Sequence, residues 1–190
     1  MLLGVPKEIK VHEYRVGMTP GSVREVIAHG HKVIVQEGAG AGIGLTDHMY
    51  RTAGAEIVPD AKTVFARADM IVKVKEPQPS ETAMLREGQV LFTYLHLAPD
   101  PEQTHALIKS KCVAIAYETV TDARGGLPLL APMSEVAGRM SIQAGAHCLE
   151  MYQGGRGLLL GGVPGCGCGQ SRHHRWRRCR RQCRAHGDGT

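Results

Sequence analysis

Residues 88–96 read Gly88-Gln89-Val90-Leu91-Phe92-Thr93-Tyr94-Leu95-His96, a nearly continuous apolar run that begins at a turn residue and ends on a histidine. Short apolar runs bounded by helical patterns are typical of strands in a parallel sheet that is covered on both faces. His96 is then expected at the carboxyl end of a strand, where open α/β sheets bind ligands. An imidazole there can exchange protons near neutral pH, although a hydrogen-bonded structural histidine fits the same pattern.

The preceding apolar run has the same form and ends on a cation. It reads Asp69-Met70-Ile71-Val72-Lys73-Val74-Lys75-Glu76-Pro77, and Pro77 is expected to stop the strand. Two adjacent strand ends therefore present Lys75 and His96 together. A cation beside an imidazole suits a small carboxylate or carbonyl substrate.

Strands and helices alternate along the rest of the first 117 residues. Strands are expected at 2–5, 31–36, 55–58 and 112–117, and helices at 19–29, 46–54, 60–68 and 101–109. This alternation predicts an α/β fold with a Rossmann-like parallel sheet, helices on both faces and right-handed crossovers. Gly125-Gly126 ends the pattern, and a long helix is expected from Pro132 to about Met151. Such a helix commonly bridges to a second domain.

The net charge of +5 is concentrated at one end of the 190-residue chain. Residues 166–190 hold seven of the 23 Lys and Arg and one acid, so residues 1–165 carry 16 basic and 17 acidic groups. Cys112 and Cys148 stand alone in apolar surroundings and are expected to be small core residues in a reduced compartment. No apolar run reaches the roughly 18 residues that a membrane span needs. The apolar run that begins at Met1 is too short for a secretory signal peptide. A cytoplasmic protein with no membrane partner is expected.

Five segments of the chain resemble the bacterial L-alanine dehydrogenase family. They are Gly4-Val5-Pro6-Lys7-Glu8, Glu13-x-Arg15-Val16, Val72-Lys73-Val74-Lys75-Glu76-Pro77, Phe92-Thr93-Tyr94-Leu95-His96-Leu97-Ala98 and Met133-Ser134-Glu135-Val136-Ala137-Gly138-Arg139-Met140. The resemblance covers residues 1–165. The related transhydrogenase α subunit is similar at the N-terminus, but it is not expected to share the histidine context or the helix that begins near Ser134.

This resemblance implies an NAD-dependent oxidative deamination of L-alanine to pyruvate and ammonia, carried out by a cytoplasmic homo-hexamer. It also names the expected domains. Residues 1–131 correspond to the N-terminal catalytic, or substrate, domain. Residues 132–165 correspond to the bridging helix and the start of the Rossmann NAD domain, and residues 166–190 fall outside the family as a basic, cysteine-rich tail.

The resemblance also implies roles for single residues, each beside a simpler interpretation. Arg15 matches the arginine that holds the substrate carboxylate, although a solvated loop charge would look the same. Lys75 matches a lysine that contacts the substrate, either polarising its carbonyl or neutralising its carboxylate, and a strand-end lysine reaching water is the alternative. His96 matches the acid/base residue. Ser134 matches a cofactor contact but is equally expected as a helix N-cap. No metal ligand set is expected in the family region.

The residues that would bind NAD are largely missing from the printed sequence. The glycine loop at 37–44 is weak evidence for a dinucleotide site and lies in the substrate domain, whereas the family places NAD elsewhere. The Gly-x-Gly-x-x-Gly turn expected soon after Gly165 is absent. We therefore expect a truncated, inactive form of the enzyme. A non-catalytic remnant that binds a small carboxylate or a partner subunit is the alternative.

Three interpretations compete for residues 166–190. Arginines around Trp176 suit a nucleic-acid-binding arm, whereas the cysteines and histidines could form a zinc site, although their spacing matches no common framework. We favour a shift of reading frame near Gly165. Read one base later, the Trp176 codon gives glycine before an arginine codon that begins with C, and CAT codons at His173 and His174 give two isoleucines. Suitable neighbouring codons then complete a strand, a Gly-x-Gly-x-x-Gly turn and a helix start.

Overall fold

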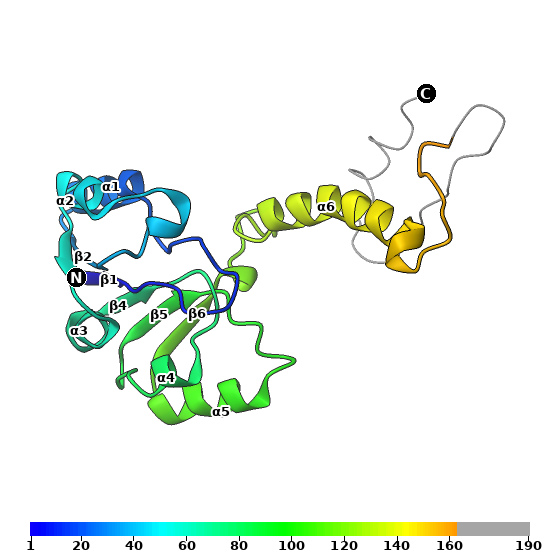
Figure 1. Cartoon of the computed structure of the whole chain (residues 1–190). Helices are drawn as coiled ribbons and strands as arrows, with labels where there is room; N and C mark the ends of the chain where they lie inside the picture. The colour runs from blue at the N-terminus through cyan, green and yellow to red at the C-terminus, as the bar shows by residue number, and fades with distance from the viewer. Residues whose placement is uncertain (163–190) are drawn as a thin grey trace. The chain divides into compact units, whose positions relative to one another are not determined.

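The computed structural model describes residues 1–162. Within them six strands form one sheet in the order β3-β2-β1-β4-β5-β6, and every neighbouring pair is parallel (Figure 1). The strands are β1 (Leu2–Val5), β2 (Lys32–Gln36), β3 (Glu56–Val58), β4 (Met70–Val72), β5 (Val90–Thr93) and β6 (Val113–Ala116). The predicted α/β fold with a Rossmann-like parallel sheet is confirmed. All three interpretations of the tail lie outside the described residues.

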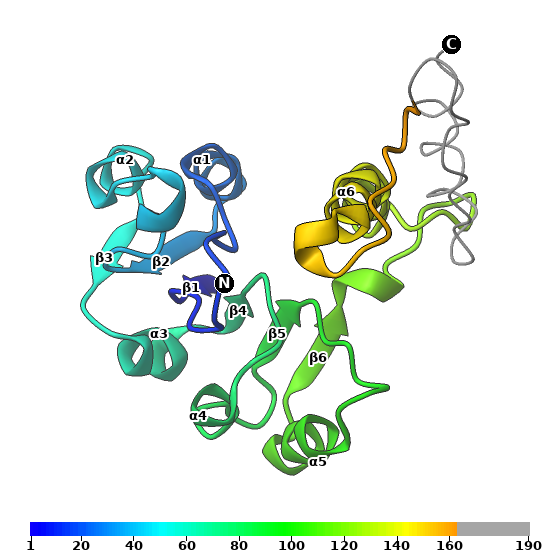
Figure 2. The ribbon, with the colours of Figure 1, turned by 45° about the vertical axis from the view of Figure 1, so that its right-hand side comes forward.

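Helices cover both faces of this sheet. They are α1 (Pro20–Ala28), α2 (Asp47–Thr52), α3 (Ala61–Arg67), α4 (Pro79–Thr82) and α5 (Pro101–Ser110). Figure 2 shows α1 and α2 on one face and α3, α4 and α5 on the other. The expected caps at Thr19 and Thr46 are present, because each side chain accepts a hydrogen bond from a backbone N–H of the first turn. The short helix α4 was not predicted.

Two apolar clusters hold the helices to the sheet. Alternate residues of β2 separate the clusters, because Val33 and Val35 pack on the α1 and α2 face and Ile34 packs on the opposite face. The first cluster is centred on Tyr50, which is fully buried and donates a hydrogen bond from its hydroxyl to the carbonyl oxygen of Met18 at 2.9 Å. Fully buried apolar side chains such as Ile34 and Val35 contribute about 1.5–3 kcal/mol each relative to exposed ones.

The strands that lead to Lys75 and His96 end earlier than the sequence predicts. β4 stops at Val72 and β5 at Thr93, so both residues lie three positions beyond a strand end. Carboxylates supply the physical reason. The N–H of Val74 donates to Oε1 of Glu8 at 2.7 Å, and the N–H of His96 donates to Oε1 of Glu118 at 2.7 Å. Beyond the strand ends these backbone N–H groups therefore bind side-chain carboxylates, and His96 adopts a left-handed φ of 49°.

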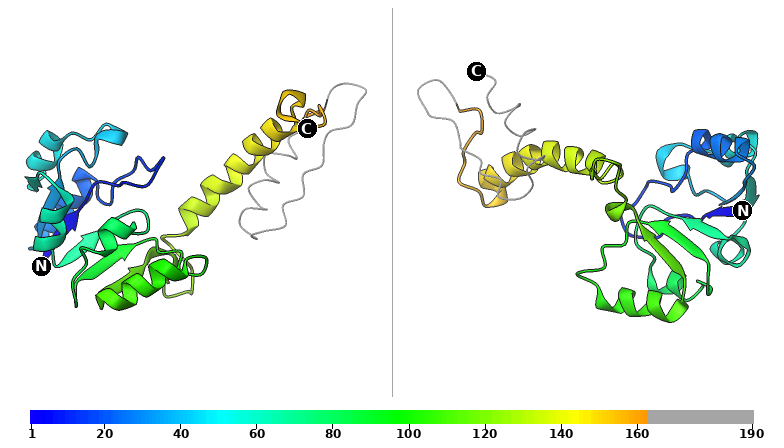
Figure 3. Two further views of the ribbon diagram at one scale, coloured as in Figure 1. Left: turned by 60° about the horizontal axis from the view of Figure 1, so that its bottom comes forward. Right: turned by 180° about the vertical axis from the view of Figure 1, so that it is seen from behind.

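The described residues divide into two units, Met1–Val120 and the part that begins at Thr121. The described part of the second unit contains α6 (Ala131–Leu149), close to the long helix that was predicted (Figure 3). Cys148 is exposed on α6 and Cys112 is half-buried, so the expectation that Cys148 is a core residue is wrong. Gly138 is the buried residue of α6, and the helix end that carries Cys148 has no buried position. No helix among residues 1–162 is long and apolar enough to span a membrane.

Candidate active site

Lys75 and His96 follow neighbouring strands at the carboxyl edge of the sheet. The pairing between their segments continues past the strand ends, because the N–H of Tyr94 donates to the carbonyl of Val74 at 3.2 Å. The hydroxyl of Thr93 then donates to the carbonyl oxygen of Lys75 at 2.8 Å. The structure therefore places both predicted residues at the same edge and ties their segments together.

Arg15 lies in the loop after β1 and is held by the carboxylate of Glu13. Its Nε donates to Oε1 of Glu13 at 2.8 Å, and its Nη2 donates to Oε2 at 2.6 Å, a bidentate arrangement. These hydrogen bonds lower the pKa of the Glu13 carboxyl and raise the pKa of the Arg15 guanidinium. The Arg15 side chain is 44% exposed. The Nε and Nη2 donors of Arg15 are thus engaged by the Glu13 carboxylate.

Shared neighbours connect Arg15 with the other two predicted residues. The Arg15 hydrogen bonds are the main cause of the low pKa of Glu13, and the positive charge of Lys75 adds to it. The ring of Tyr94 stacks on that of His96 with centroids 6.1 Å apart and an angle of 26° between the planes. Burial raises the pKa of Tyr94, while the charge of Arg15 opposes that shift. Glu13 and Tyr94 thus connect the three predicted residues: Arg15 binds Glu13 directly, Lys75 acts on Glu13 through its charge, and His96 stacks on Tyr94.

Beneath this edge lies a buried charge cluster that the sequence analysis missed. The Lys73 side chain is 1% exposed, and its Nζ lies 2.6 Å from Oε1 of Glu81 and 3.3 Å from Oε2 of Glu8. Burial raises the pKa of Glu8, and the charge of Lys73 counteracts part of that effect. One signal was available: a lysine inside an apolar strand must find a charged partner when it is buried.

The His96 backbone is fixed by a second residue that the sequence did not indicate. Glu118, in the turn η2 (Tyr117–Thr119), accepts hydrogen bonds from the N–H groups of Leu95 at 3.1 Å and His96 at 2.7 Å. The ring of Tyr117 packs edge-on against that of Tyr94, with centroids 4.9 Å apart, and burial raises the pKa of Tyr117. The chain after β6 thereby holds the segment that carries the imidazole.

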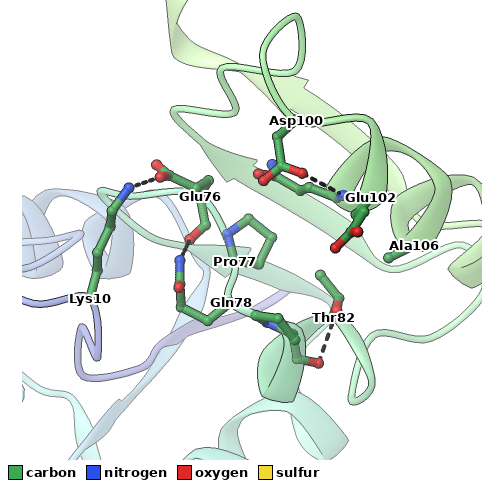
Figure 4. Close-up of a pocket in the computed structure, with 10 residues that line it drawn as sticks. Lys10, Glu76, Pro77, Gln78, Thr82, Asp100, Glu102 and Ala106 are labelled. Carbon is green, nitrogen blue, oxygen red and sulfur yellow. Dashed lines mark hydrogen bonds and ion pairs between the residues drawn. The ribbon is translucent and has the colours of Figure 1, made fainter.

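A pocket of about 420 Å³ opens beside these residues. Figure 4 shows Glu76 and Lys10 on one side of it and Asp100 and Glu102 on the other. Glu76 accepts a hydrogen bond from the ammonium of Lys10 through Oε1, and its Oε2 lies 3.8 Å from Nδ1 of His96. Arg15, Lys75 and His96 do not line this pocket. The pocket therefore adjoins the predicted site and does not coincide with it.

Ser134 lies in the second unit, in the first turn of α6. Leu130 is the N-cap of that helix, so the interpretation of Ser134 as the cap is wrong. The Ser134 hydroxyl donates to the carbonyl oxygen of Leu130 at 3.3 Å, which satisfies its own proton locally. Its oxygen can still accept a hydrogen bond. The expected cofactor contact stays a prediction.

Comparison with known proteins identifies the family to which the chain belongs. The model of the family described as "Alanine dehydrogenase/PNT, N-terminal domain" matches residues 4–137 of this chain. The chain belongs to this alanine dehydrogenase family. It is 59% identical over 165 residues to the alanine dehydrogenase of Methanococcus maripaludis and 55% identical over 170 residues to that of Bacillus subtilis. These matches cover 87% and 90% of this chain, and they cover 44% of each relative, so the chain spans less than half of their length.

Solved structures agree with the family assignment. An L-alanine dehydrogenase structure superposes with a TM-score of 0.77 at 53% identity, covering 89% of this chain and 46% of the other. The transhydrogenase from Sinorhizobium meliloti has a TM-score of 0.66 at 27% identity, covering 79% of this chain and 45% of the other. Both values are higher for the dehydrogenase than for the transhydrogenase.

Proposed function

We propose that this chain supplies the substrate-binding half of an NAD-dependent L-alanine dehydrogenase, which interconverts L-alanine with pyruvate and ammonia. The observation that carries the proposal is that Lys75 and His96 follow neighbouring parallel strands at the carboxyl edge of the sheet, with their segments hydrogen-bonded to each other. Identities of 53–59% to alanine dehydrogenases support the same activity. The resemblance also supports a cytoplasmic homo-oligomer, which is a hexamer in the family.

The substrate carboxylate is assigned to Arg15. Its guanidinium binds a carboxylate through two parallel hydrogen bonds, as it does with Glu13 in this structure, and the carboxylate of a small 2-oxo or 2-amino acid would take the place of Glu13 on these donors. Lys75 approaches from the neighbouring strand end and adds a second positive charge. That charge polarises the carbonyl of pyruvate or neutralises the carboxylate.

Proton transfer is assigned to His96. Loss of a hydride from Cα of L-alanine, with its amino group uncharged, would give an iminium ion, and addition of water with loss of a proton would give a carbinolamine that releases ammonia. The imidazole takes the proton of the attacking water and returns one to the departing nitrogen. Bound NAD supplies the hydride acceptor, and Ser134 is the residue of this chain that we propose contacts it. The remaining NAD contacts would come from the half of the relatives that this chain does not span.

The activity is testable in a chimera. Residues 1–165 of this chain would replace the corresponding segment of the Bacillus subtilis alanine dehydrogenase, to which the chain is 55% identical. The chimera should form NADH from L-alanine, and His96→Ala should lower kcat by about a hundredfold or more. Asp100→Asn, which changes a residue on the adjoining pocket, is the matched control. A folded chimera that binds NADH but does not turn over L-alanine would contradict the proposal.

A further inference from the structure

Glu76 occupies an unusual position between a lysine and the predicted acid/base residue. Its side chain is 14% exposed, and it follows Lys75 in the segment after β4. Oε1 accepts the hydrogen bond from Lys10, which anchors the carboxylate. Oε2 is buried and has no hydrogen-bond partner among the described residues, and Nδ1 of His96 lies 3.8 Å from it. The nearest ring nitrogen is thus just beyond hydrogen-bond distance from an unsatisfied acceptor.

A buried carboxylate oxygen without a donor is costly, so a donor that can reach it is favoured. A modest rotation of the imidazole brings the Nδ1–H of His96 within reach of Oε2. Lys10 already occupies the other oxygen. The surroundings therefore select which of the two ring nitrogens carries the proton.

The rest of His96 is already held. The backbone N–H donates to Glu118 at 2.7 Å, and one face of the ring stacks on Tyr94. These contacts fix the backbone and one ring face, but neither contact involves a ring nitrogen. A partner for Nδ1 is the remaining element needed to orient the imidazole.

We propose that Glu76 is a positioning residue, which accepts a hydrogen bond from Nδ1–H of His96 and so leaves Nε2 free to exchange protons with the substrate. This inference rests on the proposed function, because it assigns Nε2 the proton transfer that His96 performs there. The carboxylate of Glu76 does not touch the substrate in this arrangement. It acts through the imidazole, as a carboxylate does when it holds a catalytic histidine in one tautomer.

The tautomer can be read directly in the 190-residue chain. Long-range 1H–15N spectra of the neutral imidazoles distinguish Nδ1–H from Nε2–H, and the His96→Gln variant assigns the His96 signals. The chain should show His96 as the Nδ1–H tautomer. Glu76→Leu should convert it to Nε2–H, whereas Glu76→Gln, whose amide oxygen still accepts, should retain Nδ1–H. Glu102→Leu, at an exposed position on the same pocket, should change nothing.

The unsubstituted chain alone can overturn the proposal, since a neutral His96 in the Nε2–H form would contradict it whether or not any variant folds. A folded Glu76→Leu variant that keeps Nδ1–H would do the same. In the chimera, Glu76→Leu should lower kcat by about tenfold or more with little change in KM for L-alanine. An unchanged kcat would also count against Glu76. Because the spectra need no turnover, the tautomer can prove wrong while the chimera stays active, and the two failures are distinguishable.

Discussion

Nζ of Lys73 lies 2.6 Å from Oε1 of Glu81, and both side chains are almost completely buried. The same ammonium lies 3.3 Å from Glu8, whose other oxygen accepts the N–H of Val74. One buried cation therefore joins the loop after β1, the end of β4 and the helix α4. The segments that carry Arg15 and Lys75 are positioned by this cluster.

Replacement of Lys73 by methionine should destabilise the protein strongly. It leaves Glu8 and Glu81 buried without their shared cation, and loss of one partner in a buried ion pair costs about 3–5 kcal/mol. Urea unfolding followed by circular dichroism measures the loss. Lys111→Met is the matched control, because the pair of Lys111 with Glu87 is exposed and contributes about 1 kcal/mol or less. Equal losses for the two variants would refute the structural role of the cluster.

Glu8 should give the protein a characteristic pH dependence. Burial raises its folded-state pKa above the ordinary value of 4.5, so the folded chain holds this proton more tightly than the unfolded chain. Stability contributed by protonated Glu8 is full below pH 4.5 and is lost as the pH rises through the folded pKa. As the pH rises through the folded-state pKa of Glu8, the unfolding free energy of the unsubstituted chain should fall relative to that of the Glu8→Gln variant. A difference between the two proteins that stays constant with pH would contradict this assignment.

Glu13 should change the stability of the protein with pH in the opposite direction to Glu8, so it serves as a control. Its hydrogen bonds from Arg15 lower its pKa below 4.5, so the stability it contributes is present above pH 4.5 and is lost as the pH falls through the folded pKa. The chain should therefore lose stability relative to Glu13→Gln on acidification, whereas it gains stability relative to Glu8→Gln. Slopes of the same sign for both variants would show that the assignment of one carboxylate is wrong.

Gly17 should tolerate no side chain. A Cβ there would lie 2.3 Å from the carbonyl oxygen of Val72, so Gly17→Ala must push the loop that carries Arg15 away from the end of β4. We expect a loss of about 2 kcal/mol or more and weaker carboxylate binding. Gly21→Ala is the control, because the nearest atom at that helical position is 3.8 Å away and alanine favours a helix. Thermal unfolding that is the same for both variants would exclude this clash.

Much of the fold follows from local patterns, whereas the ends of the strands do not. Apolar runs and the caps at Thr19 and Thr46 are determined by near neighbours, so the order and type of most elements could be predicted. The ends of β4 and β5 depend on Glu8 and Glu118, which lie 66 and 22 residues from their backbone partners. Nothing local marks such a carboxylate as a backbone acceptor. The sequence pattern therefore predicts β4 and β5 to be longer than they are, although it predicts the correct edge of the sheet for Lys75 and His96.

We also propose that the reading frame shifts near Gly165, and this makes a prediction about activity. The printed sequence has no Gly-x-Gly-x-x-Gly turn to bring backbone N–H groups to a pyrophosphate, so the 190-residue chain should form no NADH from L-alanine. A gene with one base restored near codon 165 and continued to its natural stop should form NADH. Comparable turnover by the two products would contradict the frameshift, as would a nucleotide sequence whose other frames encode no glycine turn.

We propose that the edge after β4 and β5, together with the loop after β1, binds a small 2-oxo acid. Titration of the 15N-labelled chain with pyruvate tests it most directly, with Arg15→Met as the variant that removes the carboxylate receptor. We expect saturable amide shifts, in about the millimolar range or tighter, that are largest at Arg15, Lys75 and His96 and absent in the variant. Shifts centred instead on Glu102 and Gln103 of the adjoining pocket, or saturation that survives Arg15→Met, would contradict it.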